Sequence, residues 1–122
     1  IRDPRAPQQL LGVVEATRGF VVSSGDYERF FVMDGRRYHH ILDPRTGYPT
    51  QGPRGVTLVG VELETVNGFS AAIMVLGAER GRALIAAAPG LEGLIVDRDG
   101  SAWMSETLRA RLRPSTTPET ER

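Results

Sequence analysis

One short stretch of the chain, Tyr38 to Pro49, brings together an imidazole, a carboxylate, a guanidinium and a hydroxyl. His40 can move a proton near neutral pH, and Arg45 can bind phosphate oxygens through two of its N–H groups. Asp43 can hold a neighbouring cation or orient the imidazole. Such groups suit an anionic ligand. The alternative is a polar hairpin, because Asp-Pro and Thr-Gly are common turn sequences and a single histidine is often only a structural donor.

The residues around this stretch predict a β-hairpin. Residues 27–33 have the composition of a strand, Asp34-Gly35 is typical of a two-residue turn, and residues 36–42 form the returning strand. Successive side chains of a strand point to opposite faces. We therefore expect His39 and His40 to face opposite sides, so that only one of them serves a given site.

The rest of the chain predicts a mixture of strands and helices. Residues 56–64 are apolar on both faces, which indicates an interior strand. Apolar side chains then recur at helical spacing over 66–76, where Asn67 is a candidate N-cap and Gly77 ends the helix. Arg109, Arg111 and Arg113 are expected on a solvated face. The remaining expected elements are strands at 10–16, 19–23, 93–96 and 102–104, and helices at 78–88 and 105–112.

Composition limits the possible functions. The 122 residues are 40% hydrophobic, enough for one globular domain, and the net charge is zero with no basic stripe, so we expect no nucleic-acid partner. Cysteine is absent, which excludes disulfides and thiolate metal sites. No apolar run reaches the roughly 20 residues that span a bilayer. We expect residues 1–113 to form the domain and residues 114–122 to be a disordered tail.

Several ordered motifs resemble the ApbE family of FAD:protein FMN transferases (flavinyltransferases). The segment from Ser23 to Phe30 is similar to the family's T-S-G-x-Y-x-x-Y/F motif, and the segment from His40 to Pro49 is similar to H-[IV]-[IL]-D-P-x-T-G-x-P. The segments from Val56 to Leu58 and from Val66 to Gly77 resemble two later motifs. The resemblance implies the C-terminal half of an ApbE-like domain with an α+β fold, a mixed or antiparallel sheet with helices packed on it. Nothing resembles the family's N-terminal half.

The resemblance also implies a reaction. An FMN moiety moves from FAD to a threonine or serine hydroxyl of an acceptor flavoprotein, with Mg²⁺ on the pyrophosphate and AMP leaving. His40 matches the family's histidine and is the candidate base or FMN contact. Asp43, in this setting, orients either the strand end or His40. The other expected cofactor contacts are Ser24, Gly25, Arg45 and Thr46.

The chain departs from the family pattern at the implied metal site. Asn67 stands where the family has a metal-binding aspartate, and Ala71 stands where it has a threonine ligand. Mg²⁺ prefers anionic oxygen ligands, so an amide is a weaker ligand and a methyl group is none. The two positions are four apart and share a helix face. The sequence therefore predicts that Mg²⁺ binds weakly or not at all. Because the resemblance places the family's flavin-binding residues largely upstream, we expect residues 1–122 alone to bind FAD poorly.

Three functions are compatible with these residues. The first is flavinyl transfer, the second is a flavin- or nucleotide-binding module that has lost its metal site, and the third is a structural or interaction domain. Bound flavin would separate the first two from the third. The resemblance further implies a location in the bacterial periplasm or on the outer face of the cell membrane, with membrane attachment only through an upstream lipid anchor.

Overall fold

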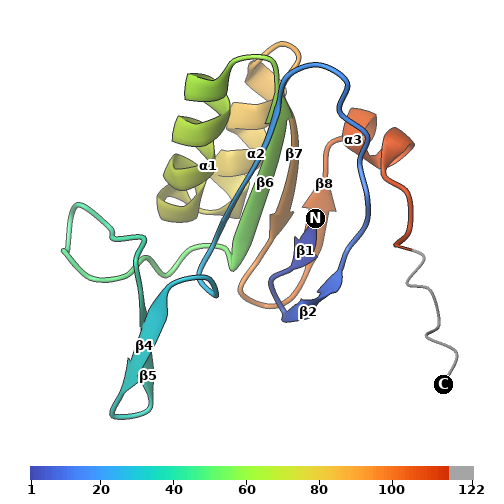
Figure 1. Cartoon of the computed structure of the whole chain (residues 1–122). Helices are drawn as coiled ribbons and strands as arrows, with labels where there is room; N and C mark the ends of the chain where they lie inside the picture. Colours follow the sequence, from blue (N-terminus) through green and yellow to red (C-terminus); the bar gives the residue numbers. More distant parts are fainter. Residues whose placement is uncertain (116–122) are drawn as a thin grey trace, which may run out of the picture.

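A four-stranded antiparallel sheet forms the centre of the protein. The computed structural model describes residues 1–115. The strands lie in the order β3 (Phe20–Gly25), β6 (Gly55–Gly60), β7 (Glu92–Val96) and β8 (Ala102–Met104) (Figure 1). Every residue of β6 is buried. The expected interior strand is therefore confirmed, and it ends at Gly60.

Both faces of the sheet are covered. Helices α1 (Leu63–Leu76) and α2 (Ala78–Ala87) lie on one face, where Leu58 of β6 packs with Ile73 of α1 in the larger core cluster (Figure 1). On the other face Val59 packs with Leu108 of the short helix α3 (Glu106–Arg111). Alternate residues of β6 thus enter two cores, which explains why both of its faces are apolar. The α+β fold expected from the sequence is confirmed.

The N-terminal segment is arranged differently from the expectation. Strands β1 (Arg2–Asp3) and β2 (Ala6–Leu10) form a small antiparallel pair, and the strand expected over 10–16 is absent beyond Leu10. Residues 11–14 instead cross the second face of the sheet, where Leu11 and Val14 pack against the smaller core cluster and Val13 forms a single bridge with Arg113. Burial against that core replaces the ladder of a strand.

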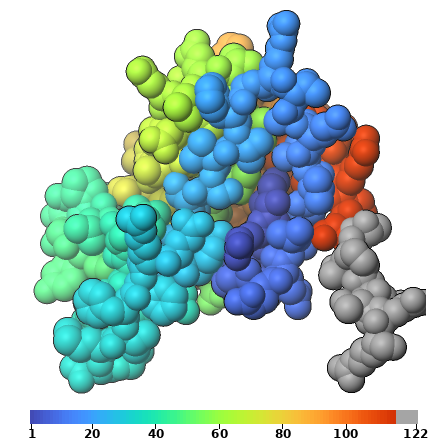
Figure 2. All heavy atoms as spheres, in the orientation of Figure 1, coloured from blue at the N-terminus to red at the C-terminus, as the bar shows by residue number. Residues whose placement is uncertain are grey.

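The expected hairpin is present and stands out from the body. Strand β4 (Phe30–Met33) pairs with β5 (Arg36–His39), and Figure 2 shows them as a protruding lobe. The turn has φ angles of 51° at Asp34 and 75° at Gly35, the left-handed pair that a type I′ turn requires. Both strands are shorter than expected, because the chain turns over residues 26–29 and leaves β5 after His39.

The helix boundaries correct two expectations. Helix α1 begins at Leu63 after a Glu62 N-cap, so Asn67 lies in its second turn and the N-cap assignment was wrong. Gly77 ends the helix with a φ of 97°, as expected. Arg111 does not simply face solvent, because it donates to both carboxylate oxygens of Glu92 and to the carbonyl of Glu15. That contact fastens α3 to β7.

Two expectations about the whole chain remain. Residues 116–122 of the expected tail lie outside the described residues, and the two described tail residues, 114 and 115, are in neither a helix nor a strand. Within residues 1–115, no helix is long and apolar enough to cross a bilayer.

Candidate functional site

The loop after β5 forms one wall of a cavity of about 510 Å³. Asp43, Arg45 and Thr46 line it together with Arg36 of β5 and Tyr48, and the C-terminal end of α1 closes the other side. The cavity therefore exists only because a loop, a hairpin strand and a helix end meet. Three of the expected cofactor-contact residues are brought together here.

The backbone of Asp43 organises this loop. Its N–H donates to the Tyr48 carbonyl at 2.8 Å, and its carbonyl accepts from the N–H groups of Thr46 and Gly47 at 3.2 and 2.8 Å. Gly47 has a φ of 72°, which glycine adopts without strain. The Asp-Pro and Thr-Gly sequences thus form a closed turn, as their composition predicted.

Asp43 holds Arg45 through two oxygens. Nε of Arg45 donates to Oδ1 at 3.1 Å, and Nη2 donates to Oδ2 at 2.8 Å. The Arg45 guanidinium holds the pKa of the Asp43 carboxyl below its ordinary value of 3.8. The ion pair therefore stabilises the folded loop fully at pH values above the ordinary pKa of the carboxyl. This stabilisation is lost as the pH falls through the lower pKa of Asp43 in the folded chain. The carboxylate orients Arg45 and the loop rather than His40.

Arg36 adds a second guanidinium to the cavity. It lies over the ring of Tyr48, 5.8 Å from the centroid, and over the ring of Tyr38 at 5.4 Å. Arginine and an exposed aromatic ring together can bind an anion that carries a planar group. Arg36 and Tyr38 lie on the same face of β5, whereas His40 follows the strand and does not line this cavity.

The two histidines differ as the alternation predicted. His39 is 7% exposed, whereas His40 is exposed. Nδ1 of His39 accepts from the N–H of Ile41 at 3.3 Å, so its Nε2–H donates to the carbonyl of Thr50 at 3.0 Å. His39 is thus a structural contact between β5 and the far end of the loop. Within residues 1–115 the His40 side chain has one weak contact, Nδ1 at 3.4 Å from the Arg29 carbonyl, and Nε2 has no partner.

Replacing His39 by alanine is expected to lower the free energy of unfolding by about 1–3 kcal/mol, because it leaves the buried Thr50 carbonyl without its donor. His40→Ala should change it by less than about 0.5 kcal/mol, since that side chain is exposed. Equilibrium urea unfolding followed by circular dichroism measures both. Equal losses for the two variants would contradict the structural role of His39.

Thr50 ties the loop to α1, and sequence reasoning missed it. Its hydroxyl donates to the carbonyl of Met74 at 2.5 Å and accepts from the N–H of Gly52 at 3.1 Å. A Cβ on Gly52 would lie 2.1 Å from the same carbonyl, so only glycine fits there. No short motif signals this contact, because its partners are far apart in the chain.

Ser24 and Gly25 lie apart from this cavity. Ser70 of α1 donates to the Asn67 carbonyl at 3.0 Å, so its oxygen must accept from the Ser24 hydroxyl, 2.8 Å away. These bonds fasten the edge strand β3 to α1. A Cβ on Gly25 would lie 2.3 Å from the ring of Tyr27, which explains the glycine without any ligand.

The two implied metal positions lie outside the cavity beside Asp43. Asn67 and Ala71 are both exposed on α1, and they share a face of the helix as expected. Within residues 1–115, no three histidine, aspartate or glutamate side chains come close enough to hold a metal ion. One amide and one methyl group do not fit Mg²⁺.

Comparison with known proteins identifies the family of this chain. The family described as "ApbE family" matches residues 1–95. The chain belongs to the ApbE family. The curated relatives include FAD:protein FMN transferases of Treponema pallidum (strain Nichols), 37% identical over 115 residues, and of Klebsiella pneumoniae (strain 342), 33% identical over 108 residues. These matches cover 93% and 88% of this chain, but 32% and 34% of the relatives.

Solved ApbE structures share the fold. The ApbE protein of Thermotoga maritima MSB8 is 39% identical with a TM-score of 0.80, and the match covers 92% of this chain and 37% of that one. The flavin transferase ApbE from Vibrio cholerae is 34% identical with a TM-score of 0.59, over 75% of this chain and 29% of that one. The chain therefore spans about a third of the length of the ApbE proteins it matches.

Proposed function

We propose that this protein transfers the FMN moiety of FAD to a serine or threonine hydroxyl of an acceptor flavoprotein. The observation that carries the proposal is the membership of residues 1–95 in the ApbE family, whose relatives are named FAD:protein FMN transferases. The cavity beside Asp43 supports it, because two guanidinium groups and an aromatic ring suit a phosphate joined to a planar group.

The residues of this chain would act on the phosphates and on the attacking hydroxyl. Arg36 attracts the negative charge of FAD, and the Asp43–Arg45 pair holds the wall of the cavity in place. The acceptor oxygen bonds to the phosphorus of the FMN half, and the bond from that phosphorus to the bridging oxygen breaks, so AMP leaves with the electron pair. The free Nε2 of His40 takes the hydroxyl proton.

A second candidate is a module that binds flavin or a nucleotide without transfer. Asn67 and Ala71 favour it, because neither the carboxylate nor the hydroxyl that the resemblance implies is present. We derive no step through Mg²⁺, since these residues do not fit the ion. If transfer occurs, Arg36 contributes to neutralising the charge of the FAD phosphates. A place in the periplasm or on the outer face of the membrane, through an upstream lipid anchor, is part of the proposal, and cell fractionation tests it.

The experiment is to incubate the full-length protein with FAD and a peptide that carries an acceptor threonine, with and without Mg²⁺. Transfer adds the mass of the FMN moiety to the peptide, which mass spectrometry detects. Bound flavin without peptide modification supports the binding module. Absence of both flavin fluorescence and modification would reject both functions.

The double substitution Asn67→Asp with Ala71→Thr is expected to raise the affinity for Mg²⁺ by about tenfold or more, because it restores an anionic and a second oxygen ligand on one helix face. Isothermal titration calorimetry measures the change. The matched control, Ala83→Asp with Ala87→Thr, places the same groups at the same spacing on an exposed face of α2 and should have no such effect. Tight Mg²⁺ binding by the unmodified protein would show that the site is intact.

A further inference from the structure

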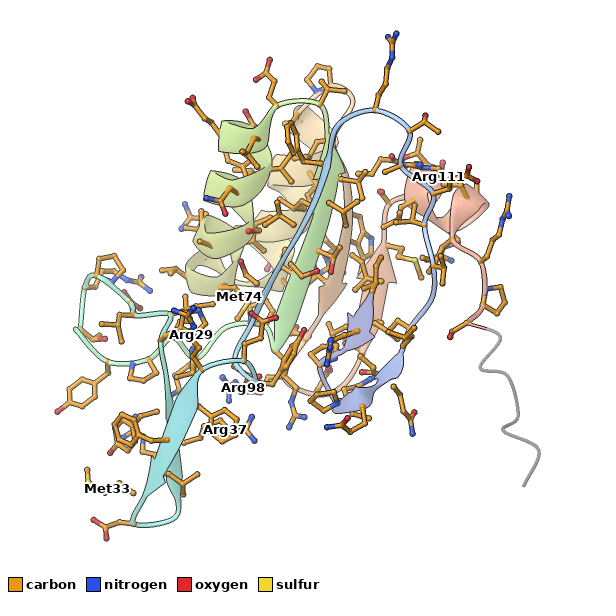
Figure 3. The ribbon with its side chains drawn as sticks, in the orientation of Figure 1. Arg29, Met33, Arg37, Met74, Arg98 and Arg111 are labelled. Atoms are coloured by element: carbon orange, nitrogen blue, oxygen red, sulfur yellow. The ribbon has the colours of Figure 1, made fainter. Side chains whose placement is uncertain are left out.

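A second cavity, of about 290 Å³, is lined by four arginines from separate parts of the chain. Arg5 follows β1, Arg37 lies in β5, Arg54 precedes β6 and Arg98 lies in the turn between β7 and β8. In Figure 3, Arg37 lies on the side of the hairpin that faces Arg98. Four like charges in one small cavity repel one another, so their convergence calls for a compensating negative group.

The carboxylates of the described chain compensate only part of this charge. Asp3 pairs with Arg5 through both of its oxygens, at 2.8 and 2.7 Å. Asp26 lies 3.8 Å from Nη1 of Arg37. Within residues 1–115 no carboxylate comes within 4 Å of the Arg54 or Arg98 guanidinium. Asp3 and Asp26 are therefore paired with Arg5 and Arg37, and the Arg54 and Arg98 guanidinium groups have no carboxylate partner within residues 1–115.

Two carboxylates flank Arg98 in the nearby turn, and both accept hydrogen bonds within the turn. Asp97 accepts from the backbone N–H of Arg98, and Asp99 accepts from the N–H and hydroxyl of Ser101. Neither carboxylate lines the cavity. Within residues 1–115, neither carboxylate forms an ion pair with a guanidinium of the cavity.

Three of the guanidinium groups have free donors. Within residues 1–115, Oδ1 of Asp26 is buried and accepts no hydrogen bond, and the Arg37 guanidinium, whose Nη1 lies 3.8 Å from it, donates none. Arg37 is held over the ring of Phe30, 4.2 Å from the centroid, at the wall of the cavity. Arg98 uses only Nε, which donates to the Gln51 carbonyl at 3.0 Å, and no side-chain bond of Arg54 is present in residues 1–115. A small anion would therefore find N–H donors on several sides.

We propose that this cavity binds a dianionic phosphate group through Arg37, Arg54 and Arg98. The charge is complementary, since the two guanidinium groups without a carboxylate partner would balance a phosphate that carries about two negative charges near neutral pH. The volume lies just below the range of pockets for drug-sized ligands, which suits a phosphate with a small substituent. Arg36 and Arg37 point to opposite faces of β5, so this site is separate from the cavity beside Asp43 and does not depend on the proposed transfer.

The test is calorimetric titration of the full-length protein in a chloride buffer free of phosphate and sulfate. The probes are inorganic phosphate and glycerol 3-phosphate. Arg54→Gln and Arg98→Gln should each weaken binding by about tenfold or more, because each removes a charge-assisted donor. The matched controls Arg80→Gln and Arg82→Gln remove the same charge from exposed positions of α2 and should leave binding unchanged. Arg98→Lys keeps the charge but loses the planar fork, so it replaces Arg98→Gln if that variant does not fold.

The two probes distinguish the source of the phosphate. Tighter binding of glycerol 3-phosphate assigns the site to a phosphomonoester, and equal or tighter binding of inorganic phosphate assigns it to the free ion. No saturable binding of either probe up to about 10 mM would overturn the proposal. Equal losses in the cavity variants and the α2 controls would also overturn it, because they would show a general effect of net charge.

Discussion

Replacing Ile73 by alanine is expected to lower the free energy of unfolding by about 2–5 kcal/mol. Ile73 is fully buried on the inner face of α1, in the same cluster as Leu58 and Ile95. A Cβ on Gly81 of α2 would come within 2.4 Å of the Ile73 side chain, which shows how closely the two helices meet. Such close packing cannot fully collapse around the lost atoms, so a cavity remains.

Equilibrium urea unfolding of the chain, followed by circular dichroism, measures this loss. Val61→Ala is the control, because Val61 is 73% exposed just after β6 and its truncation should change stability by less than about 0.5 kcal/mol. A loss at Ile73 no larger than that at Val61 would mean that the packing between α1 and the sheet does not carry the stability of this fold.

The parts of the fold that follow from local chemistry could be predicted from the sequence. The turn at Asp34-Gly35 requires two positive φ angles, which this dipeptide adopts readily, and Gly77 ends α1 for the same reason. The opposite orientation of His39 and His40 follows from the period of a strand. In each case the residues that decide the structure are neighbours in the chain.

The start of α1 could not be predicted because its local signal is weak. Glu62 caps the helix without a side-chain hydrogen bond, and Leu63 is 49% exposed, so neither a capping residue nor burial marks the first turn. Asn67 is a much better capping residue, so the sequence predicts the start of the helix about one turn too late. The helix begins where the chain leaves β6, which is a tertiary constraint.

In the candidate site, too, local features could be predicted from the sequence and long-range contacts could not. The motif residues Asp43, Arg45 and Thr46 were expected to act together, and they line one cavity. The far wall could not be foreseen, because it depends on Thr50 binding the Met74 carbonyl across 24 positions of the chain. Ser24, by contrast, matches a motif and yet its hydroxyl is used to hold β3 against α1. A motif match therefore located the loop but did not give every residue its role.

His40→Ala in the full-length protein is expected to lower the rate of flavin transfer by about 10²–10⁴-fold, the usual contribution of a general base. The variant should fold normally, since the side chain is exposed and its one contact is long. Single-turnover transfer to an acceptor peptide, followed by mass spectrometry over a range of pH, measures the rate. If His40 removes the hydroxyl proton, the pH dependence of the rate should differ between the variant and the unmodified protein.

Comparison with His39→Ala shows whether His40 acts as a base or only helps to hold the loop in place. His39 engages both ring nitrogens inside the protein, so its loss should act through stability, and the transfer rate of the folded fraction should fall far less. His40→Gln keeps a donor at a similar position but cannot take a proton. If His40→Gln transfers flavin as fast as the unmodified protein, His40 only contacts the ligand and does not take the proton. Equal rate losses for His39→Ala and His40→Ala would contradict a role of His40 as the base. Two histidines that only hold the loop in place would give the same result.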